Sequence, residues 1–316
     1  MSASKSIPSA SEIRMPRLNL LLLYLLLLAT PCVAQTAVTA NEIPFSLQKG
    51  LIIVEAKIKG DVTVNVVLAT GMELSVTDPA LLQKYQLGAF YTAEGPVTGR
   101  NDKTFSFTKV SELRIGNSKP KDLMLRFGSV AELSRMAGKE IFAAVGADFF
   151  AGQTVQLDFK TNVVRFLEQV PPELIDTKHP NFNAARATVL RMAPKADEFV
   201  RKTYMVSLVK DVQMNGQKTN LLFDTGIATV LALSSSTGKK VGLSVPAENE
   251  APREDKVTLR FDANEFPDVP AMVYPKGTGA DQNLSKSGGA VAGALFLQRF
   301  IATFDYKKGV VVLERF

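Results

Sequence analysis

Histidine and cysteine are almost absent from this chain of 316 residues, which contains one of each, His179 and Cys32. A structural zinc site takes four ligands, mostly Cys and His. A Ser-His-Asp triad would have to use His179, which stands beside Pro180, and the chain has no Gly-x-Ser-x-Gly elbow. We therefore expect no metal site and no cofactor, and a surface position for His179.

Concentrated charge is also missing. The formal net charge is +6, and Lys5, Glu12, Arg14 and Arg17 supply a net +2 of it near the N-terminus, leaving +4 for the rest of the chain. Nucleic-acid binding needs a basic stripe or an aromatic stacking motif, and neither stands out. We therefore expect no nucleic-acid partner.

Long apolar runs occur only at the N-terminus. Arg14 and Arg17 precede the Leu-rich run 18–29, and small residues lead to Ala34. This order is typical of a secretory signal, cleaved here after Ala34. An uncleaved membrane anchor is the alternative, although the run is shorter than the ~20 residues of a spanning helix. We expect a secreted or periplasmic protein that loses Cys32 with the signal (residues 1–34) and begins with a polar lead-in over residues 35–43.

Alternating β-branched runs separated by turn residues make up most of the chain after residue 43. Residues 51–60 and 62–68 flank Asp61 and predict a hairpin. Asp78 before Pro79 predicts an N-capped short helix. The pattern predicts an all-β fold with short helices. Further strands are expected over residues 110–115, 123–127, 154–159 and 163–167.

The second half of the chain repeats this pattern. Residues 204–209 predict a strand, and Asn215-Gly216 predicts a two-residue hairpin turn. Gly146 precedes Asp158 by 12 positions, and Gly293 precedes Asp305 by 12. We infer two tandem copies of one β-rich unit. The equivalent stretches are 143–150 with 290–297, and 154–167 with 301–313.

Proline and mixed charge mark residues 169–200, which open on Pro171-Pro172. We interpret them as an interdomain connection, partly helical around residues 182–190. The chain then divides into a first lobe over 44–168 and a second lobe over 201–316.

The most specific motif is an apolar strand that runs into an Asp-Thr-Gly turn. Residues 221–223 precede Asp224-Thr225-Gly226, and in the first copy residues 66–68 precede Ala69-Thr70-Gly71. Val145-Gly146 and Ala292-Gly293 come later at comparable distances. Together these features resemble the retropepsin-like aspartic protease family over both halves of the chain. The resemblance implies two tandem retropepsin-like β-barrel lobes fused in one chain.

In that family each lobe supplies one Asp, and the two carboxyls share a proton and drive a water onto the peptide carbonyl. The resemblance makes Asp224 the candidate acid/base. It implies that Thr225 and Thr70 join the lobes through hydroxyl-to-backbone hydrogen bonds. It also implies that Gly226 and Gly71 allow the tight turns.

The departure from the family is Ala69, the degenerate partner position, because alanine carries no proton. Glu73 lies four positions further on, where the family tends to have a structural acid. Three alternatives stay open. The chain is a pseudoprotease that binds peptide without cutting it, an aspartic endopeptidase that pairs Asp224 with Asp224 of a second chain, or a β protein in which the Asp-Thr-Gly is coincidental.

We interpret the remaining motifs as structural and not as parts of a functional site. Residues 288–293 lack the Gly-Lys-Ser/Thr ending of a phosphate loop and are expected to enter a strand. Asp158 and Asp305 each precede a hairpin turn, and Ser-x-x-Lys recurs too often to carry weight. Residues 88–109, rich in Gly and Pro, predict a hairpin that is either a mobile flap or an ordinary surface hairpin.

Overall fold

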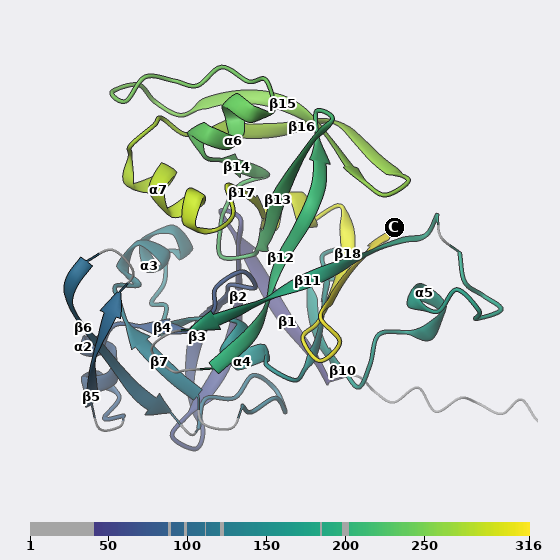
Figure 1. Ribbon diagram of the computed structural model, residues 1–316. Helices are drawn as coiled ribbons and strands as arrows, with labels where there is room; N and C mark the ends of the chain where they lie inside the picture. Colours follow the sequence, from purple (N-terminus) through teal and green to yellow (C-terminus); the bar gives the residue numbers. More distant parts are fainter. Residues whose placement is uncertain are drawn as a thin grey trace, which may run out of the picture. The chain divides into compact units, whose positions relative to one another are not determined.

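The computed structural model describes residues 41–87, 90–97, 100–110, 112–120, 123–183, 185–197 and 202–316. Residues 40–316 form one compact unit. The described part holds 19 strands and seven helices of four to eight residues, which confirms an all-β fold with short helices (Figure 1). No described helix combines the length and apolar character needed to cross a membrane. The predicted signal lies outside the described residues.

Strands from both halves of the chain share one antiparallel sheet of six strands. They are β1 (Asn41–Gln48), β9 (Thr154–Asp158), β10 (Val163–Leu167), β11 (Ala187–Asp197), β18 (Phe300–Asp305) and β19 (Val310–Arg315). The order is β1-β10-β9-β18-β19-β11, so the closing hairpins of the two halves meet at β9–β18. Figure 1 shows purple β1 and yellow β18 in this region.

The first half adds a second sheet, in the order β1-β2-β3-β8-β4-β7-β6-β5. Its strands are β2 (Leu51–Ile58), β3 (Val62–Leu68), β4 (Val76–Thr77), β5 (Phe90–Val97), β6 (Arg100–Val110), β7 (Leu123–Phe127) and β8 (Ala143–Val145). Pairing is parallel between β3 and β8 and between β4 and β7, because the chain returns to the same edge after each crossover.

The second half builds a sheet that repeats several of these pairings. Its strands are β12 (Lys202–Met214), β13 (Gln217–Asp224), β14 (Leu231–Leu233), β15 (Arg253–Phe261), β16 (Asn264–Val273) and β17 (Ala290–Gly293). The order is β11-β12-β13-β17-β14-β16-β15, and β15 also pairs with β12. Parallel β13–β17 and β14–β16 repeat β3–β8 and β4–β7. The repeated spacing in the sequence therefore coincides with a repeated pairing pattern.

Short helices cover the sheets. They are α2 (Pro79–Lys84), α3 (Ala131–Ala137), α4 (Ala147–Phe150), α5 (Pro172–Ile175), α6 (Ser235–Lys240), α7 (Gly279–Lys286) and α8 (Ala294–Leu297). Asp78 caps α2, as predicted, by accepting from Ala80 N at 2.9 Å. One continuous apolar core runs through both halves, from Ile52 and Val66 to Phe223 and Phe296. Burial of this shared core is the main favourable term that holds the halves together.

Most predicted hairpins are confirmed. β2 pairs with β3, β9 with β10, and β12 with β13 around Asn215-Gly216, both of which have positive φ as a two-residue hairpin turn requires. The hairpin predicted within residues 88–109 is β5–β6, although no observation tests whether it is a flap. The strand predicted over 110–115 is wrong beyond Val110, because only isolated bridges at Arg114 and Ile115 come after it.

Two sequence predictions fail near strand ends of the shared sheet. The helix expected around residues 182–190 is wrong, because β11 begins at Ala187 and pairs with both β19 and β12. Ala185 and Ala187 favour helix locally, but Thr188 and Val189 gain more from pairing in a sheet. The polar lead-in is also wrong in part, since β1 begins at Asn41 and pairs with β10 from there.

Candidate functional site

The Ala69-Thr70-Gly71 and Asp224-Thr225-Gly226 turns begin where β3 and β13 end. Each of these strands is buried at its C-terminal end and has a parallel neighbour, β8 or β17, on one side. Ala69 N donates to Val145 O at 2.9 Å, and Asp224 lies opposite Gly293. The apolar-apolar-Gly segments noted in the sequence therefore flank the turns and fix where each strand ends.

The two turns are joined by reciprocal threonine hydrogen bonds. Thr70 Oγ1 donates to Phe223 O at 3.0 Å and accepts from Thr225 N at 3.2 Å. Thr225 Oγ1 donates to Leu68 O at 2.6 Å and accepts from Thr70 N at 3.3 Å. Both side chains are fully buried. The hydroxyl-to-backbone bonds expected of these two residues are present, and they lie within one chain.

The joined turns place Ala69 beside Asp224. A Cβ on Gly71 would stand 2.6 Å from Asp224 Cβ, and a Cβ on Gly226 would stand 2.8 Å from Ala69 Cβ. Distances this short exclude a side chain at either position, so both glycines are needed for the turns to approach. Position 69 is therefore the nearest counterpart of Asp224 across the junction, and it carries a methyl group.

Asp224 is held in a site that favours its protonated form. Burial raises the pKa of its carboxyl, and hydrogen bonds from the backbone N–H groups of Gly226 and Gly71 lower it less than burial raises it. The Gly226 N–H lies 2.8 Å from Asp224 Oδ1. The negative charge of Glu73 adds to the raised pKa. The group therefore keeps its proton to a higher pH than an exposed aspartate does.

Glu73 does not replace the missing carboxylate at position 69. Its side chain is partly exposed and forms an ion pair with Lys195 of β11, which belongs to the second half of the chain. The pair ties the end of β11 to the segment that comes after the Ala69 turn. Its effect on Asp224 is through charge, since Glu73 is not among the hydrogen-bond partners of that carboxyl.

Two residues beneath the turns were not singled out from the sequence. Tyr306 is buried and donates to Thr70 O at 3.0 Å, and Ser207 Oγ donates to the same oxygen at 2.9 Å. Burial, followed by the charge of Asp224, raises the pKa of Tyr306 well above its usual value. Tyr306 follows Asp305, whereas in the first copy Phe159 follows Asp158. This replacement of Phe by Tyr at equivalent positions was the sequence feature that could have indicated a role for the Tyr306 hydroxyl.

Other candidates stay outside this junction. Asp158 Oδ1 accepts from Lys160 N and Thr161 N, and Asp305 Oδ1 accepts from Lys307 N and Lys308 N, so both cap hairpin turns as predicted. His179 Nδ1 accepts from Asn181 N in the segment after α5. Across the described residues, no group of three or more His, Cys, Asp or Glu side chains could hold a metal ion.

Exposed apolar side chains lie next to the Asp224 turn. Ile227 comes directly after it and is 38% exposed, and Leu295, in α8 after Gly293, is 36% exposed. Ala294 N donates to Ile227 O at 3.2 Å, so the two segments are in contact. In the first copy the position of Leu295 holds Asp148, which is buried and bonded to Ser75. The second half thus presents a more apolar surface beside its turn.

The arrangement supplies one carboxyl, held by the backbone N–H groups of Gly226 and Gly71, and an apolar margin. Among the described residues, no second acid/base group donates to or accepts from the Asp224 carboxyl. Comparison with protein-family models and with curated proteins gives no significant match for this chain.

Proposed function

We propose that this chain consists of two retropepsin-like lobes and acts as a peptide-binding pseudoprotease. The observation that carries the proposal is the pairing of Ala69 with Asp224 at two turns joined by Thr70 and Thr225. The repeated strand pairings and the sheet shared by both halves support the assignment of two fused lobes.

A single buried carboxyl explains the absence of cleavage in this proposal. Shared-proton catalysis needs one carboxyl as acid and a second as base, and neighbouring like charges set their pKa values apart. At position 69 the methyl group can neither take nor give a proton. Each acid/base group contributes roughly 10²–10⁴-fold to rate, so Asp224 alone leaves hydrolysis slow while the surface beside it still binds peptide.

The decisive experiment restores the missing acid. We expect Ala69→Asp to cleave a peptide library at acidic pH at least about 10²-fold faster than the wild type. The matched control is Ala69→Asn, which has the same shape without the ionisable group, and the double variant Ala69→Asp/Asp224→Asn should again be inert. If Ala69→Asp folds and cuts nothing, the two-carboxyl geometry proposed for the turns is wrong.

Binding is tested separately from cleavage. Peptides selected by display against the wild type should be enriched for binding, and the same peptides should be substrates of Ala69→Asp. If no peptide is enriched, the proposal that the wild type binds peptides is wrong. The assignment of two retropepsin-like lobes would then be tested by the cleavage experiment alone.

A homodimeric protease is the weaker alternative. For Asp224 of a second chain to reach Asp224, the intrachain bonds of Thr70 and Thr225 would first have to open. We expect the wild type to sediment as a monomer and to cut nothing. A dimer whose cleavage is lost in Asp224→Asn would favour the alternative.

We also propose that the protein is exported. The basic residues and Leu-rich run before Ala34 support this assignment. In an expression host with the full chain, the mature protein should begin at Gln35, as N-terminal sequencing or intact mass would determine. A chain that keeps residues 1–34 and stays with the membrane fraction would indicate an anchor.

A further inference from the structure

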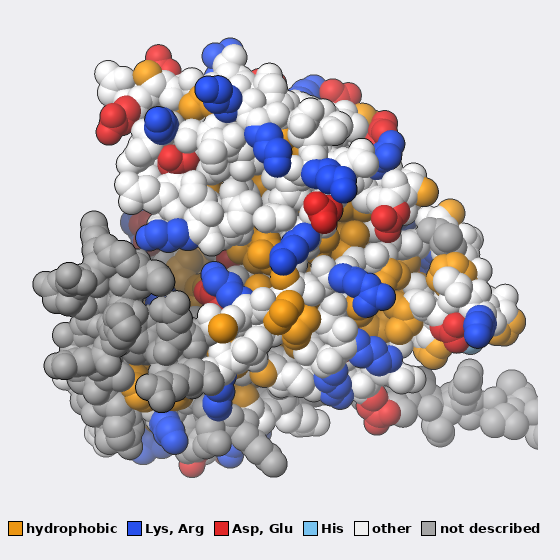
Figure 2. Space-filling model, in the orientation of Figure 1, with side chains coloured by type: hydrophobic (Ala, Val, Ile, Leu, Met, Phe, Trp, Pro, Cys, Tyr) orange, Lys and Arg blue, Asp and Glu red, His pale blue; other side chains and the backbone are white. Residues whose placement is uncertain are grey.

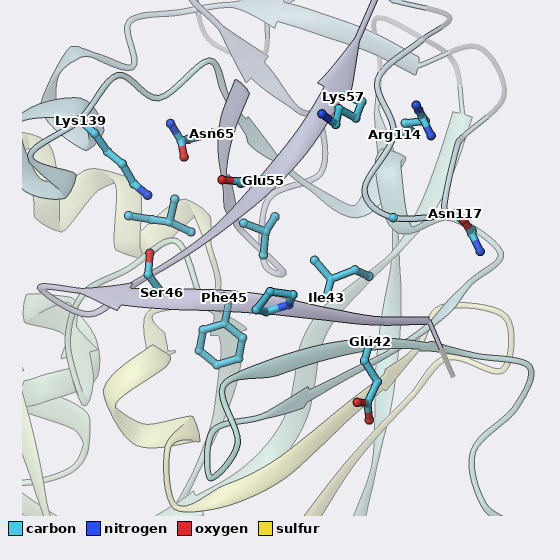
Figure 3. Close-up of a pocket in the computed structure, with 14 residues that line it drawn as sticks. Glu42, Ile43, Phe45, Ser46, Glu55, Lys57, Asn65, Arg114, Asn117 and Lys139 are labelled. Carbon is cyan, nitrogen blue, oxygen red and sulfur yellow. The ribbon is translucent and has the colours of Figure 1, made fainter. Parts of the chain in front are cut away.

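A separate cavity of about 610 Å³ lies on the outer face of β2 and β3, and no residue of the two turns lines it. Its size falls within the range of sites for small molecules. Figure 3 shows the lining side chains of β1, β2 and β3 with Lys139 and Arg114 at its margins.

Two features of the fold open this cavity. α3 covers Ile53 and Val67 on the outer face, but the helix ends at Ala137, with Gly138 as its C-cap, and leaves the Glu55–Asn65 cross-strand pair uncovered. β1 pairs with β2 only as far as Phe45, because Pro44 has no N–H for the ladder and pairs on the β10 side instead. The space between the diverging strands is therefore built into the sheet.

One side of the cavity offers donors. Ser46 Oγ is buried and has no hydrogen-bond partner, which is a cost that a bound acceptor would remove. Lys139 is exposed and has no ion-pair or hydrogen-bond partner among the described residues. In Figure 3 the Lys139 ammonium and the Ser46 hydroxyl point toward the same space. Together they match a carboxylate.

Acceptors from β2 and β3 lie beside these donors. Asn65 Nδ2 donates to Glu140 O at 3.2 Å, so its Oδ1 faces away from that bond and toward the cavity. Glu55 pairs with no cation in the part of the chain that the structure describes. The nearby cations are occupied elsewhere, since Lys57 donates to Thr63 and Arg114 pairs with Asp61. Asn65 and Glu55 therefore match an ammonium group.

We propose that this cavity binds a small zwitterion of the amino-acid type. Its carboxylate meets Lys139 and Ser46, its ammonium meets Glu55 and Asn65, and its side chain lies over the exposed ring of Pro44, which favours an apolar amino acid. A purely anionic ligand would meet Glu55, and a purely cationic one would meet Lys139. Only a molecule with both charges satisfies both the donors and the acceptors.

The test is calorimetric titration of the full chain with each of the twenty amino acids, with L-leucine as the first probe. We expect saturable binding of an apolar amino acid. 4-Methylpentanoate, which lacks the ammonium, and 3-methylbutylamine, which lacks the carboxylate, should each bind at least about tenfold more weakly than leucine.

Variants locate the site. Lys139→Met and Glu55→Gln should each weaken binding at least about tenfold, whereas Lys160→Met and Glu248→Gln, exposed residues elsewhere, should leave it unchanged. Thermal melting checks that each variant is folded. The proposal is overturned if no amino acid binds, if either single-charge analogue binds as well as leucine, or if Lys139→Met and Glu55→Gln bind like the wild type.

Discussion

At the scale of single residues, two threonines determine how the halves of the chain meet. Each hydroxyl donates to a buried carbonyl across the junction and accepts from the opposite backbone N–H. Removing the Thr225 hydroxyl takes this partner from both Thr70 N and Leu68 O, which costs more than the net value of a hydrogen bond. Phe223 O, the acceptor for Thr70, also accepts from Ser207 Oγ.

We expect Thr225→Val to lower the free energy of unfolding by about 3 kcal/mol. Thr70→Val should lower it by less, because Phe223 O keeps its hydrogen bond from Ser207. Valine keeps the shape and removes the hydroxyl, so the loss reports the hydrogen bonds. Chemical denaturation provides the measurement. The matched control is Thr258→Val, at a half-buried strand position whose hydroxyl makes no hydrogen bond to a described residue. Equal stability of the Thr225→Val and Thr258→Val variants would contradict the role of the threonines.

A second residue-scale effect is pH dependence from Asp148. Burial raises the pKa of this carboxyl to about 6, against the opposing hydrogen bonds from Ser75 and Phe149. Because the folded state then binds more protons than the unfolded state, its stability rises as pH falls from about 6 toward 4 and is lost as pH rises through 6.

We expect wild type and Asp148→Asn to differ in this window. Relative to the variant, the wild type should gain about 2 kcal/mol of stability between pH 8 and pH 4, measured by denaturation at each pH. Asp268→Asn, a change at an exposed position, should follow the wild type. A constant difference between wild type and Asp148→Asn across the range would show that Asp148 does not titrate in this way.

At the scale of elements, the tight turns depend on glycine where the two strand ends approach. Gly71 faces Asp224 Cβ and Gly226 faces Ala69 Cβ at distances that leave no space for a methyl group. The close approach is thus a property of the pair of turns and not of either strand alone.

We expect Gly71→Ala to destabilise the fold by about 1–3 kcal/mol, because the backbone must move to admit the new Cβ. Thermal or chemical unfolding measures this. Gly279→Ala is the control, since a Cβ there meets nothing within 4 Å and alanine favours the first turn of α7. If the Gly71→Ala and Gly279→Ala variants have the same free energy of unfolding, the close approach of the two turns is not needed for stability.

At the scale of the whole molecule, the six-stranded sheet makes the halves one folding unit. β9 of the first half pairs with β18 of the second through five residue pairs, and the apolar core is continuous. Figure 2 shows one face of this unit, on which Lys and Arg side chains are scattered among apolar ones. The sheet and the apolar core are therefore continuous across the pairing of β9 with β18, and no solvent-exposed boundary separates the two halves there.

We expect amides of β9 and β18 to exchange with the same free energy of opening, equal to that of global unfolding. Hydrogen-exchange mass spectrometry of peptides covering 154–158 and 300–305 measures this. Thr225→Val should lower both values equally, and peptides from the exposed tip of β15–β16 serve as the internal control. Opening of β9 alone would contradict a single cooperative unit.

Local patterns predicted much of this architecture. The Asn-Gly turn, the Asp78 cap and the alternating hairpins are short-range features that the backbone follows directly. β11 was missed because its helix-favouring alanines are outweighed by pairing with β19 and β12.

The candidate site was predictable only in part. The residues of the two turns are marked by their motifs, but the Glu73–Lys195 ion pair joins positions far apart in the chain. The position of Tyr306 under Thr70 and the cavity beside Pro44 likewise depend on how strands diverge in three dimensions. No sequence pattern encodes these contacts.

The facing of Ala69 and Asp224 has a genetic consequence. In an assembly of two identical chains every substitution appears twice, so alanine on one side of a two-fold axis means alanine on both. Here the repeated unit lies twice within one chain, and each copy varies by itself. The first copy keeps the β5–β6 hairpin and has no acid, while the second keeps the acid and has no strand equivalent to β5 among its described residues. Because both copies lie on one chain, a substitution in one copy leaves the equivalent position of the other copy unchanged.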